Sequence, residues 1–292
     1  MTIFKHRDLP LHYLERGCGD PLLLIHGLGS SGADWAFQVR ALEGGFRVIV
    51  PDLPGCGHSA AHPDGATIAE LAASLWALLD RLQIARPNIV GYSLGGAVAL
   101  EMALQRPNCV PRLGLINSLT SYRLDTVSKW FEARLPVLLI AVFGMRLLGR
   151  LCAARMFPQP WQSALRERAA AVIGTAPPAS YIAIIAALVQ WSANARLECL
   201  RSRVLIIAAE HDLTPLERKH ALAAQLGAAI AVVRGSRHGT PFDAMEATNA
   251  CIFALLSDQP PPSADRLACD GRQPAQPLAF AGSLAEQHAL GP

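Results

Sequence analysis

The segment from Asn88 to Leu100 places a serine in a sharp turn between an apolar strand-like stretch and an apolar helix-like stretch. Its sequence, Asn-Ile-Val-Gly-Tyr-Ser-Leu-Gly-Gly-Ala-Val-Ala-Leu, sets Ser93 between Gly91 and Gly95. The two glycines let the strand and the helix approach closely, and the turn exposes the serine hydroxyl on a strained backbone. A strand–turn–helix unit of this kind belongs in a sheet that is covered by helices.

The rest of the chain alternates short apolar segments with helical patterns. A parallel sheet buried on both faces needs strands that are apolar throughout, and this describes residues 22–25, 47–50, 89–91, 113–117, 204–208 and 231–233. Residues Leu11–Glu15 alternate weakly, which suggests an early antiparallel strand. The clearest helix starts at Thr67, which forms a capping box with Glu70. We therefore predict an α/β fold with a doubly wound, mostly parallel sheet.

Two downstream strands are followed by residues that could activate the hydroxyl of Ser93. Glu210 and Asp212 follow one predicted strand, and His238 follows the next. A serine needs a base that takes its proton, and an imidazole serves when a carboxylate orients it. The order Ser93, Asp212, His238 is the one expected around a strand–turn–helix serine. Glu210 is the alternative acid, and we prefer Asp212 because of its position at the strand end.

At these residues the chain resembles the α/β-hydrolase family. Residues Pro21–Ser30 resemble the oxyanion loop of that family, and Val48–Ser59 resemble its next strand and turn. The resemblance runs from about residue 11 to residue 256 and is interrupted by a dissimilar middle. It implies a hydrolase core over 1–118 and 198–257, with an inserted helical lid over 119–197.

The resemblance also implies a role for each site residue. Ser93 would be the nucleophile, Asp212 the acid and His238 the base. The backbone amides of Leu28 and Leu94 would hold the oxyanion, where one such donor is worth about 3 kcal/mol. The family's haloalkane dehalogenases and epoxide hydrolases carry an aspartate at the position of the serine, which argues against those activities.

The implied reaction is hydrolysis of a carboxylic ester or a related acyl bond through an acyl-enzyme, with an apolar substrate that carries an acyl chain. We expect no cofactor and no metal site. Thioesterases, lactonases and carbon–carbon bond hydrolases of the family share the triad and stay open as alternatives. A non-catalytic, ligand-binding member of the fold is a further alternative, because fold alone does not establish activity.

The lid contains the most hydrophobic stretch of the chain, Leu135–Met145. This stretch is too short to span a bilayer before Arg146 and Arg150 interrupt it. We favour the interpretation that it is a helix buried against the core. The alternative is that it lines an acyl pocket. The candidate pocket residues are then Tyr92, Leu138 and Val142.

The lid is also basic. Over residues 119–197 it holds nine arginines and lysines against three acids, a net charge of +6, although the whole chain carries only +3. A basic and apolar lid suits amphiphilic anionic substrates or a membrane surface. A solvated cationic face without a partner is the plainer interpretation, and the sequence favours it. The modest net charge and the lack of a reader motif argue against nucleic-acid binding, so the expected partner is a small molecule.

Three further features concern location and the end of the chain. The first residues are too polar for a secretory signal, so we expect a cytoplasmic protein. The seven cysteines have irregular spacing and predict neither a disulfide framework nor a zinc site. Residues 258–292 are rich in Pro, Ala, Gly and Gln, which predicts a disordered tail.

Overall fold

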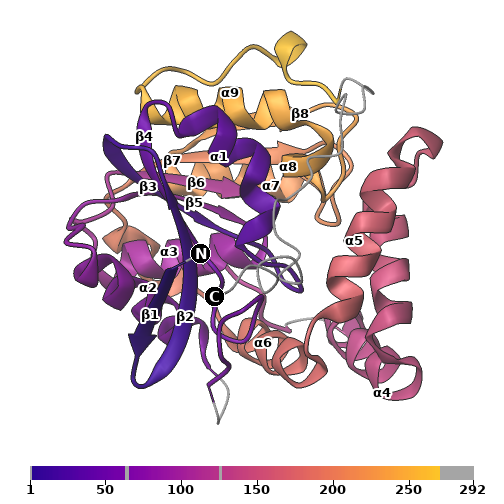
Figure 1. The fold of residues 1–292 in the computed structure, drawn as a ribbon. Coiled ribbons are helices and arrows are strands. Elements are labelled where there is room, and N and C mark those ends of the chain that lie inside the picture. Colours follow the sequence, from indigo (N-terminus) through magenta and orange to yellow (C-terminus); the bar gives the residue numbers. More distant parts are fainter. Residues whose placement is uncertain (1, 63–65, 125–126, 270–292) are drawn as a thin grey trace, which may run out of the picture.

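The computed structural model describes residues 2–62, 66–124 and 127–269, and at its centre is one eight-stranded sheet (Figure 1). The strands are β1 (Thr2–His6), β2 (Leu9–Arg16), β3 (Asp20–Ile25), β4 (Phe46–Pro51), β5 (Asn88–Tyr92), β6 (Arg112–Ile116), β7 (Arg203–Ala209) and β8 (Ala229–Val233). Their order across the sheet is β1-β2-β4-β3-β5-β6-β7-β8. β2 runs antiparallel to both neighbours, and the strands from β4 to β8 are parallel. The predicted doubly wound, mostly parallel sheet is confirmed, and β1 is an additional edge strand.

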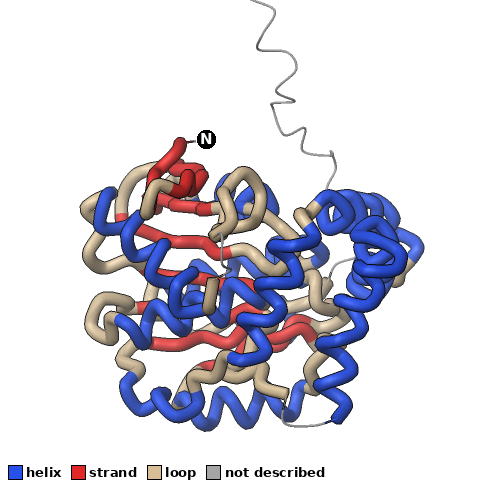
Figure 2. Tube along the Cα trace, turned by 90° about the horizontal axis from the view of Figure 1, so that it is seen from below, coloured by secondary structure: helices blue, strands red, loops and turns tan. Residues whose placement is uncertain are grey.

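Helices cover both faces of this sheet, and Figure 2 shows them on either side of the strands. One face packs on α2 (Ile68–Arg81), α3 (Leu94–Gln105) and α7 (Leu216–Leu226), and the other on α1 (Ala36–Leu42) and α9 (Met245–Leu256). Successive side chains of a strand point to opposite faces, so Leu23 packs in the first layer and Leu24 in the second. The shorter helices are η1 (Gly32–Trp35), η2 (Pro160–Gln162), η3 (Asn194–Cys199), α8 (Thr240–Asp243) and η4 (Ala264–Arg266).

The helix α2 begins at the capping box that the sequence predicts. The Thr67 hydroxyl accepts a hydrogen bond from the Glu70 amide at 3.2 Å, and the Glu70 carboxylate accepts one from the Thr67 amide at 2.8 Å. Each bond satisfies a backbone donor that the first turn of a helix leaves without a partner.

The lid is inserted between β6 and β7 and consists of α4 (Val127–Met156), α5 (Ser163–Thr175) and α6 (Pro178–Gln190). Figure 1 shows α4 and α5 as a pair of helices beside the α/β core. The lid has a small apolar core of its own, in which Ile140, Met145 and Leu148 of α4 pack with Ile173 and Tyr181. The lid therefore has an apolar core of its own in addition to its contacts with the α/β core.

The end of the lid is fastened to the helix that follows the serine turn. Glu101 of α3 is buried, and its carboxylate accepts a hydrogen bond from the indole of Trp191 at 2.8 Å. The guanidinium of Arg196 pairs with the same carboxylate through two bonds of 2.6 and 3.0 Å. These charged hydrogen bonds outweigh burial and lower the pKa of Glu101 from its usual value. The lid thus returns to the core at a fixed point.

The helix α4 is broken rather than straight. Gly144 has φ 76° and ψ 174°, which no helical residue adopts, and it divides α4 into two parts. By length and mean hydropathy (1.9) alone, the segment Arg134–Met156 is long and apolar enough to cross a membrane, contrary to the expectation from sequence. The segment is broken at Gly144, and its second part packs on α5, where Gly149 lies against the backbone of Ala170 and Gly174.

The tail differs from the sequence expectation over its first residues. The backbone of Arg234, after β8, exchanges hydrogen bonds of 2.9 Å with Leu267 and Cys269. Leu267 is buried in the apolar layer beneath α9. The buried Leu267, these backbone bonds and the ion pairs of Asp258 with Arg112 and Arg203 hold this stretch, although its composition is polar. Residues 270–292 of the predicted disordered tail lie outside the described residues.

Candidate active site

The turn at Ser93 has the strained geometry that the sequence predicts. Ser93 adopts φ 54° and ψ −114°, a conformation that L-residues rarely take. Its amide donates to the carbonyl of Ile116 at 2.9 Å, and its own carbonyl accepts from the hydroxyl of Ser118 at 2.8 Å. These bonds hold the residue in place from β6, which is how a fold sustains local strain of about 1–3 kcal/mol.

The two glycines of the turn are required by close packing. A Cβ on Gly91 would lie 2.1 Å from the carbonyl oxygen of Gly95, and one on Gly95 would lie 2.1 Å from that of Ile25. Both distances are far inside van der Waals contact with backbone atoms that cannot rotate away. The strand, the turn and the oxyanion loop therefore approach each other only because these positions have no side chain.

The structure brings Ser93, His238 and Asp212 into one chain of hydrogen bonds. The Nε2 atom of His238 lies 3.0 Å from Oγ of Ser93, and its Nδ1 atom lies 2.6 Å from Oδ1 of Asp212. When Nδ1–H donates to the carboxylate, Nε2 is left to accept from the hydroxyl. The imidazole also packs against the ring of Tyr92, with 5.4 Å between centroids. The arrangement can draw a proton from the serine.

The geometry also decides between the two candidate acids. The carboxylate of Asp212 is buried against His238, whereas Glu210 is exposed and accepts a hydrogen bond from the amide of Gly235 at 2.8 Å. His211 lies beside Glu210 and is exposed as well. Glu210 serves the loop after β8, and Asp212 faces the imidazole.

Two buried residues that the sequence analysis missed tie the loops of the acid and the base together. Lys219 of α7 is fully buried, and its ammonium donates to Oδ2 of Asp212 and, at 3.0 Å, to Oδ1 of Asn117. The amide of Asn117 donates in turn to the carbonyl of His238 at 2.9 Å and to Oγ1 of Thr240 at 2.8 Å. One amide side chain thus holds both loops in register.

These contacts set the charge of the acid. Burial alone would raise the pKa of Asp212, but the hydrogen bond and charge of His238, together with Lys219, lower it from 3.8 to about 2. Burial lowers the pKa of the Lys219 ammonium, and its pairing with Asp212 opposes that shift. The carboxylate is therefore ionised at neutral pH and shared between an ammonium and an imidazole.

The loop after β3 is held by a buried histidine. His26 accepts a hydrogen bond from the amide of Leu53 at Nε2, 3.0 Å away, and its Nδ1 lies 2.8 Å from the carbonyl oxygen of Gly27. This pattern requires a neutral ring, and burial lowers the pKa of His26 accordingly. His26 thus fixes the loop backbone. A Cβ on Gly27 would lie 3.7 Å from Cβ of Ser93, so this loop is next to the serine.

The backbone amides of Leu28 and Leu94 belong to the two segments next to the serine. Leu94 is the first residue of α3, where amides have no partner within the helix, and Leu28 follows Gly27 in the loop after β3. No hydrogen bond joins either amide to another residue in the described ranges. Both amides are thus available to an oxygen bound beside Ser93.

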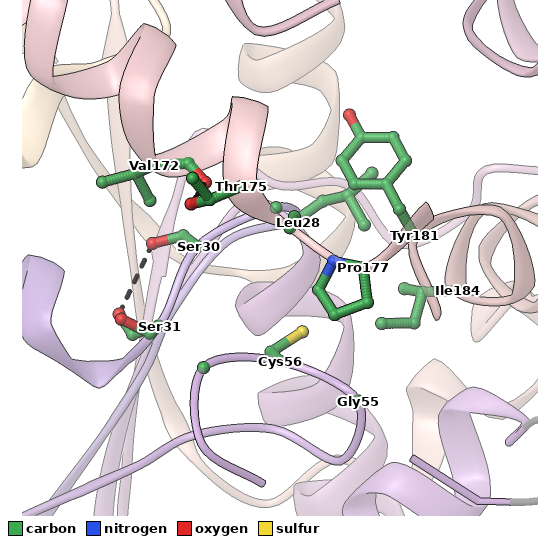
Figure 3. A pocket seen from close by; sticks show the side chains of 13 residues that line it. Leu28, Ser30, Ser31, Gly55, Cys56, Val172, Thr175, Pro177, Tyr181 and Ile184 are labelled. Carbon is green, nitrogen blue, oxygen red and sulfur yellow. Dashed lines mark hydrogen bonds between the residues drawn. The ribbon is translucent and has the colours of Figure 1, made fainter. Parts of the chain in front are cut away.

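A pocket of about 230 Å³ opens from this loop toward the lid (Figure 3). Leu28, Ser31 and Cys56 line its core side, and Pro177 and Tyr181 line its lid side. Neither Ser93 nor His238 lines the pocket. The loop that carries Leu28 lines the pocket and also lies next to Ser93. Burial raises the pKa of the Cys56 thiol to about 12, which makes this sulfur an apolar wall.

None of the three pocket residues proposed from the sequence lines this pocket. Leu138 and Val142 are each 60% exposed on α4 and do not line this pocket, whose lid wall comes from α5 and α6. Tyr92 is buried and packs on His238 and Phe242 beneath the site. The run Leu135–Met145 is apolar all round the helix, so its composition could not indicate which side faces inward.

Known proteins resemble this chain over most of its length. The family model described as alpha/beta hydrolase fold matches residues 20–226. A putative carbamate hydrolase RutD from Rhizobium rhizogenes is 32% identical over 227 residues, which covers 75% of this chain and 85% of that protein. A putative carbamate hydrolase RutD from Variovorax paradoxus is 34% identical, covering 70% of this chain and 79% of that protein.

Solved structures agree on the fold. An enol-lactonase from Burkholderia xenovorans superposes with a TM-score of 0.79 at 24% identity and covers 88% of this chain and all of its own. A thermophilic esterase from Thermogutta terrifontis gives a TM-score of 0.77 at 25% identity, covering 86% of this chain and 94% of its own. With the sheet order, the serine turn and these matches in place, the chain belongs to the α/β hydrolase fold family.

Proposed function

We propose that this hydrolase cleaves a carboxylic ester or a related acyl bond through an acyl-enzyme, with Ser93 as nucleophile. The hydrogen-bonded chain from Ser93 Oγ through His238 to Asp212, with links of 3.0 and 2.6 Å, is the observation that carries the proposal. A serine hydroxyl becomes a nucleophile when an oriented base takes its proton, and this chain supplies both the base and the group that orients it.

The reaction proceeds in two acyl transfers. Oγ of Ser93 attacks the substrate carbonyl while its proton moves to Nε2 of His238, and the tetrahedral oxyanion is held by the amides of Leu28 and Leu94. The carbon–oxygen bond to the leaving alcohol then breaks, and the alcohol departs with the proton from His238. Water next attacks the acyl-enzyme, gives a proton to His238, and releases the acid as Ser93 recovers its proton.

Buried charge around His238 supports this sequence of steps. Asp212 is ionised across the neutral range because its pKa lies at about 2, so it stabilises the imidazolium that forms in each transfer. The ammonium of Lys219 donates to Oδ2 of the carboxylate, and Oδ1 of Asn117 accepts from the same ammonium at 3.0 Å. These groups are positioned before the substrate arrives, which removes the cost of ordering them during the reaction.

The pocket beside the Leu28 loop admits a group of modest size. Its volume of about 230 Å³ is below the roughly 300–1,000 Å³ typical of sites for drug-sized ligands. Leu28, Tyr181 and Ile184 give it apolar walls, and the hydroxyls of Ser30 and Thr175 add polar groups at its edge. We infer a short or medium acyl group rather than a long-chain lipid tail in this pocket.

A carbamate is the second candidate substrate class. Two relatives that share about a third of their residues with this chain carry the name putative carbamate hydrolase. A carbamate ester presents the same attacked carbonyl and the same alcohol leaving group, so the proposed steps apply without change. Thioesters, lactones and carbon–carbon bonds beside a carbonyl offer the same electrophile to Ser93. The ordered hydrogen-bonded chain of Ser93, His238 and Asp212 argues against a non-catalytic role.

A matched panel of small acyl substrates tests the proposal. Wild type and Ser93→Ala are assayed on p-nitrophenyl acetate, butyrate and octanoate, on a p-nitrophenyl carbamate and on an acyl thioester. We expect Ser93-dependent turnover with kcat/KM highest for the short or medium esters. Turnover of the carbamate above that of every ester would favour the second class. Equal rates for wild type and Ser93→Ala on all compounds would refute the proposed hydrolase mechanism.

A further inference from the structure

The first part of α4 exposes apolar side chains along one side. Leu135, Leu138 and Val142 lie at the spacing i, i+3 and i+7, which places them on one helix face, and they are 55%, 60% and 60% exposed. Phe143, at the break of the helix, is 62% exposed. Ile140, by contrast, is buried in the lid core. The helix therefore has an apolar side that packs inward and a second apolar side that faces solvent.

This concentration is unusual for the molecule. Five of the eight large apolar side chains that are exposed in the described part of the chain lie on α4, and the others are scattered singly over the core. Only 28% of the apolar window within Arg134–Met156 is buried. Single exposed apolar residues need no explanation. A contiguous group of them marks a surface that binds a partner protein or a membrane.

Positive charge adjoins the apolar side chains. The segment from 134 to 156 contains four arginines and no acid. Arg146 follows Phe143 by three residues, and Arg150 lies one turn further on. Both are exposed, and neither forms an ion pair with any residue whose position the structure describes. Their charge is thus available to an anionic partner.

We propose that this surface, formed by Leu135, Leu138, Val142, Phe143, Arg146 and Arg150, docks onto a bilayer that contains anionic phospholipid. We call it the α4 surface. A helix that lies in a membrane interface buries apolar side chains at the level of the acyl chains and holds arginines among the phosphate groups. The α4 surface carries both features within one segment of the chain, and the break at Gly144 separates its apolar part from its arginines.

A second copy of the chain fits this surface less well. A symmetric contact would bring the same patch from both copies together, so the exposed arginines would approach one another with no acid from this segment to pair with. Protein interfaces are also depleted of charge at their centre. An anionic bilayer complements both the charge and the apolar area.

Vesicle flotation tests the α4 surface with the full chain. Vesicles of phosphatidylcholine alone are compared with vesicles in which a third of the lipid is phosphatidylglycerol, at low and at high salt. We expect flotation with the anionic vesicles at low salt and weaker flotation at high salt, because screening reduces the attraction of the arginines. No flotation with anionic vesicles at low salt would overturn the proposal.

Two sets of substitutions separate the apolar and the charged contributions. The triple variant Leu135→Ser, Leu138→Ser and Val142→Ser should lose flotation on the anionic vesicles. The double variant Arg146→Glu with Arg150→Glu should bind anionic vesicles at least about tenfold more weakly. Flotation equal to that of wild type for either set would overturn the proposal.

Matched variants on the α/β core serve as controls. Ile3→Ser and Phe253→Ser remove exposed apolar side chains, and Arg40→Glu with Arg86→Glu reverses two exposed charges, all outside the lid. These should float as wild type does, and an equal loss in the controls would overturn the assignment. Far-UV circular dichroism confirms that each variant is folded. Because flotation does not require turnover, this result is independent of the proposed reaction.

Discussion

Replacing Lys219 by methionine tests how the buried charges support the base. The side chain of Lys219 is fully buried between Asp212 and Asn117, and methionine has nearly its shape without the charge. Removing one partner of a buried ion pair leaves an uncompensated charge and costs about 3–5 kcal/mol. His238 still pairs with Asp212, so we expect the free energy of unfolding to fall by about 3 kcal/mol, at the lower end of that range.

The same change should alter the pH dependence of turnover. In the wild type the charge of Asp212 is shared by Lys219 and His238, and without the ammonium the carboxylate stabilises the imidazolium more strongly. A protonated ring cannot accept the proton of Ser93. Taking the coupling across the carboxylate as about 1–2 kcal/mol, the acid limb of kcat/KM should move about one pH unit upward.

The assay follows kcat/KM for a p-nitrophenyl ester from acid to neutral pH, alongside urea unfolding. Arg218→Met is the control, since it removes a neighbouring but exposed charge of the same helix and should change neither quantity. A Lys219→Met variant that loses stability but keeps the acid limb of the wild type would show that Lys219 acts only in folding. An unchanged free energy of unfolding would refute the account of the buried pair.

Three further predictions concern the turn, the pocket and a buried acid. Gly95→Ala should cost more than about 3 kcal/mol of stability, because its Cβ would lie 2.1 Å from a carbonyl oxygen of β3, whereas Gly45→Ala, which has open space around it, should be tolerated in urea unfolding. Ala176→Phe should fill the pocket and lower kcat/KM for butyrate about tenfold, and Leu138→Phe on the exposed side of α4 should not; equal effects would remove the pocket assignment. Burial raises the pKa of Asp243 from 3.8 to about 6, so the folded state keeps this proton longer than the unfolded chain does. The protonated Asp243 therefore contributes about 3 kcal/mol to the free energy of unfolding below about pH 4, and this contribution is lost as the pH rises through about 6. In Asp243→Asn this pH dependence of the free energy of unfolding should be absent.

The sequence predicts the three side chains of the hydrogen-bonded chain because each of them follows a strand. Ser93, Asp212 and His238 come after apolar segments of a parallel sheet, whose carboxyl ends meet at one edge. Lys219 gives no such signal. It lies among charged residues at the start of α7, a pattern typical of a solvated helix face, and only the approach of that helix to Asp212 shows that it is buried.

The lid shows a second limit of prediction from sequence. Its position and helical character follow from the break in the strand–helix alternation after β6. The inward side of α4 does not follow, because Ile140, Leu138 and Val142 are equally apolar and only tertiary packing distinguishes the buried one from the exposed two. The sequence therefore proposes α4 as a pocket wall, whereas α5 and α6 line the pocket beside Leu28. The strands and the serine turn are as predicted.

The most direct test of the account is covalent labelling of the full chain with a fluorophosphonate, read by intact-protein and peptide mass spectrometry. The predicted result is one adduct per chain, located on Ser93, with labelling slowed strongly in His238→Ala and absent in Ser93→Ala. Labelling of Ser93→Ala to the extent seen in wild type, or a wild-type adduct on any other residue, would contradict the assignment of Ser93 as the nucleophile.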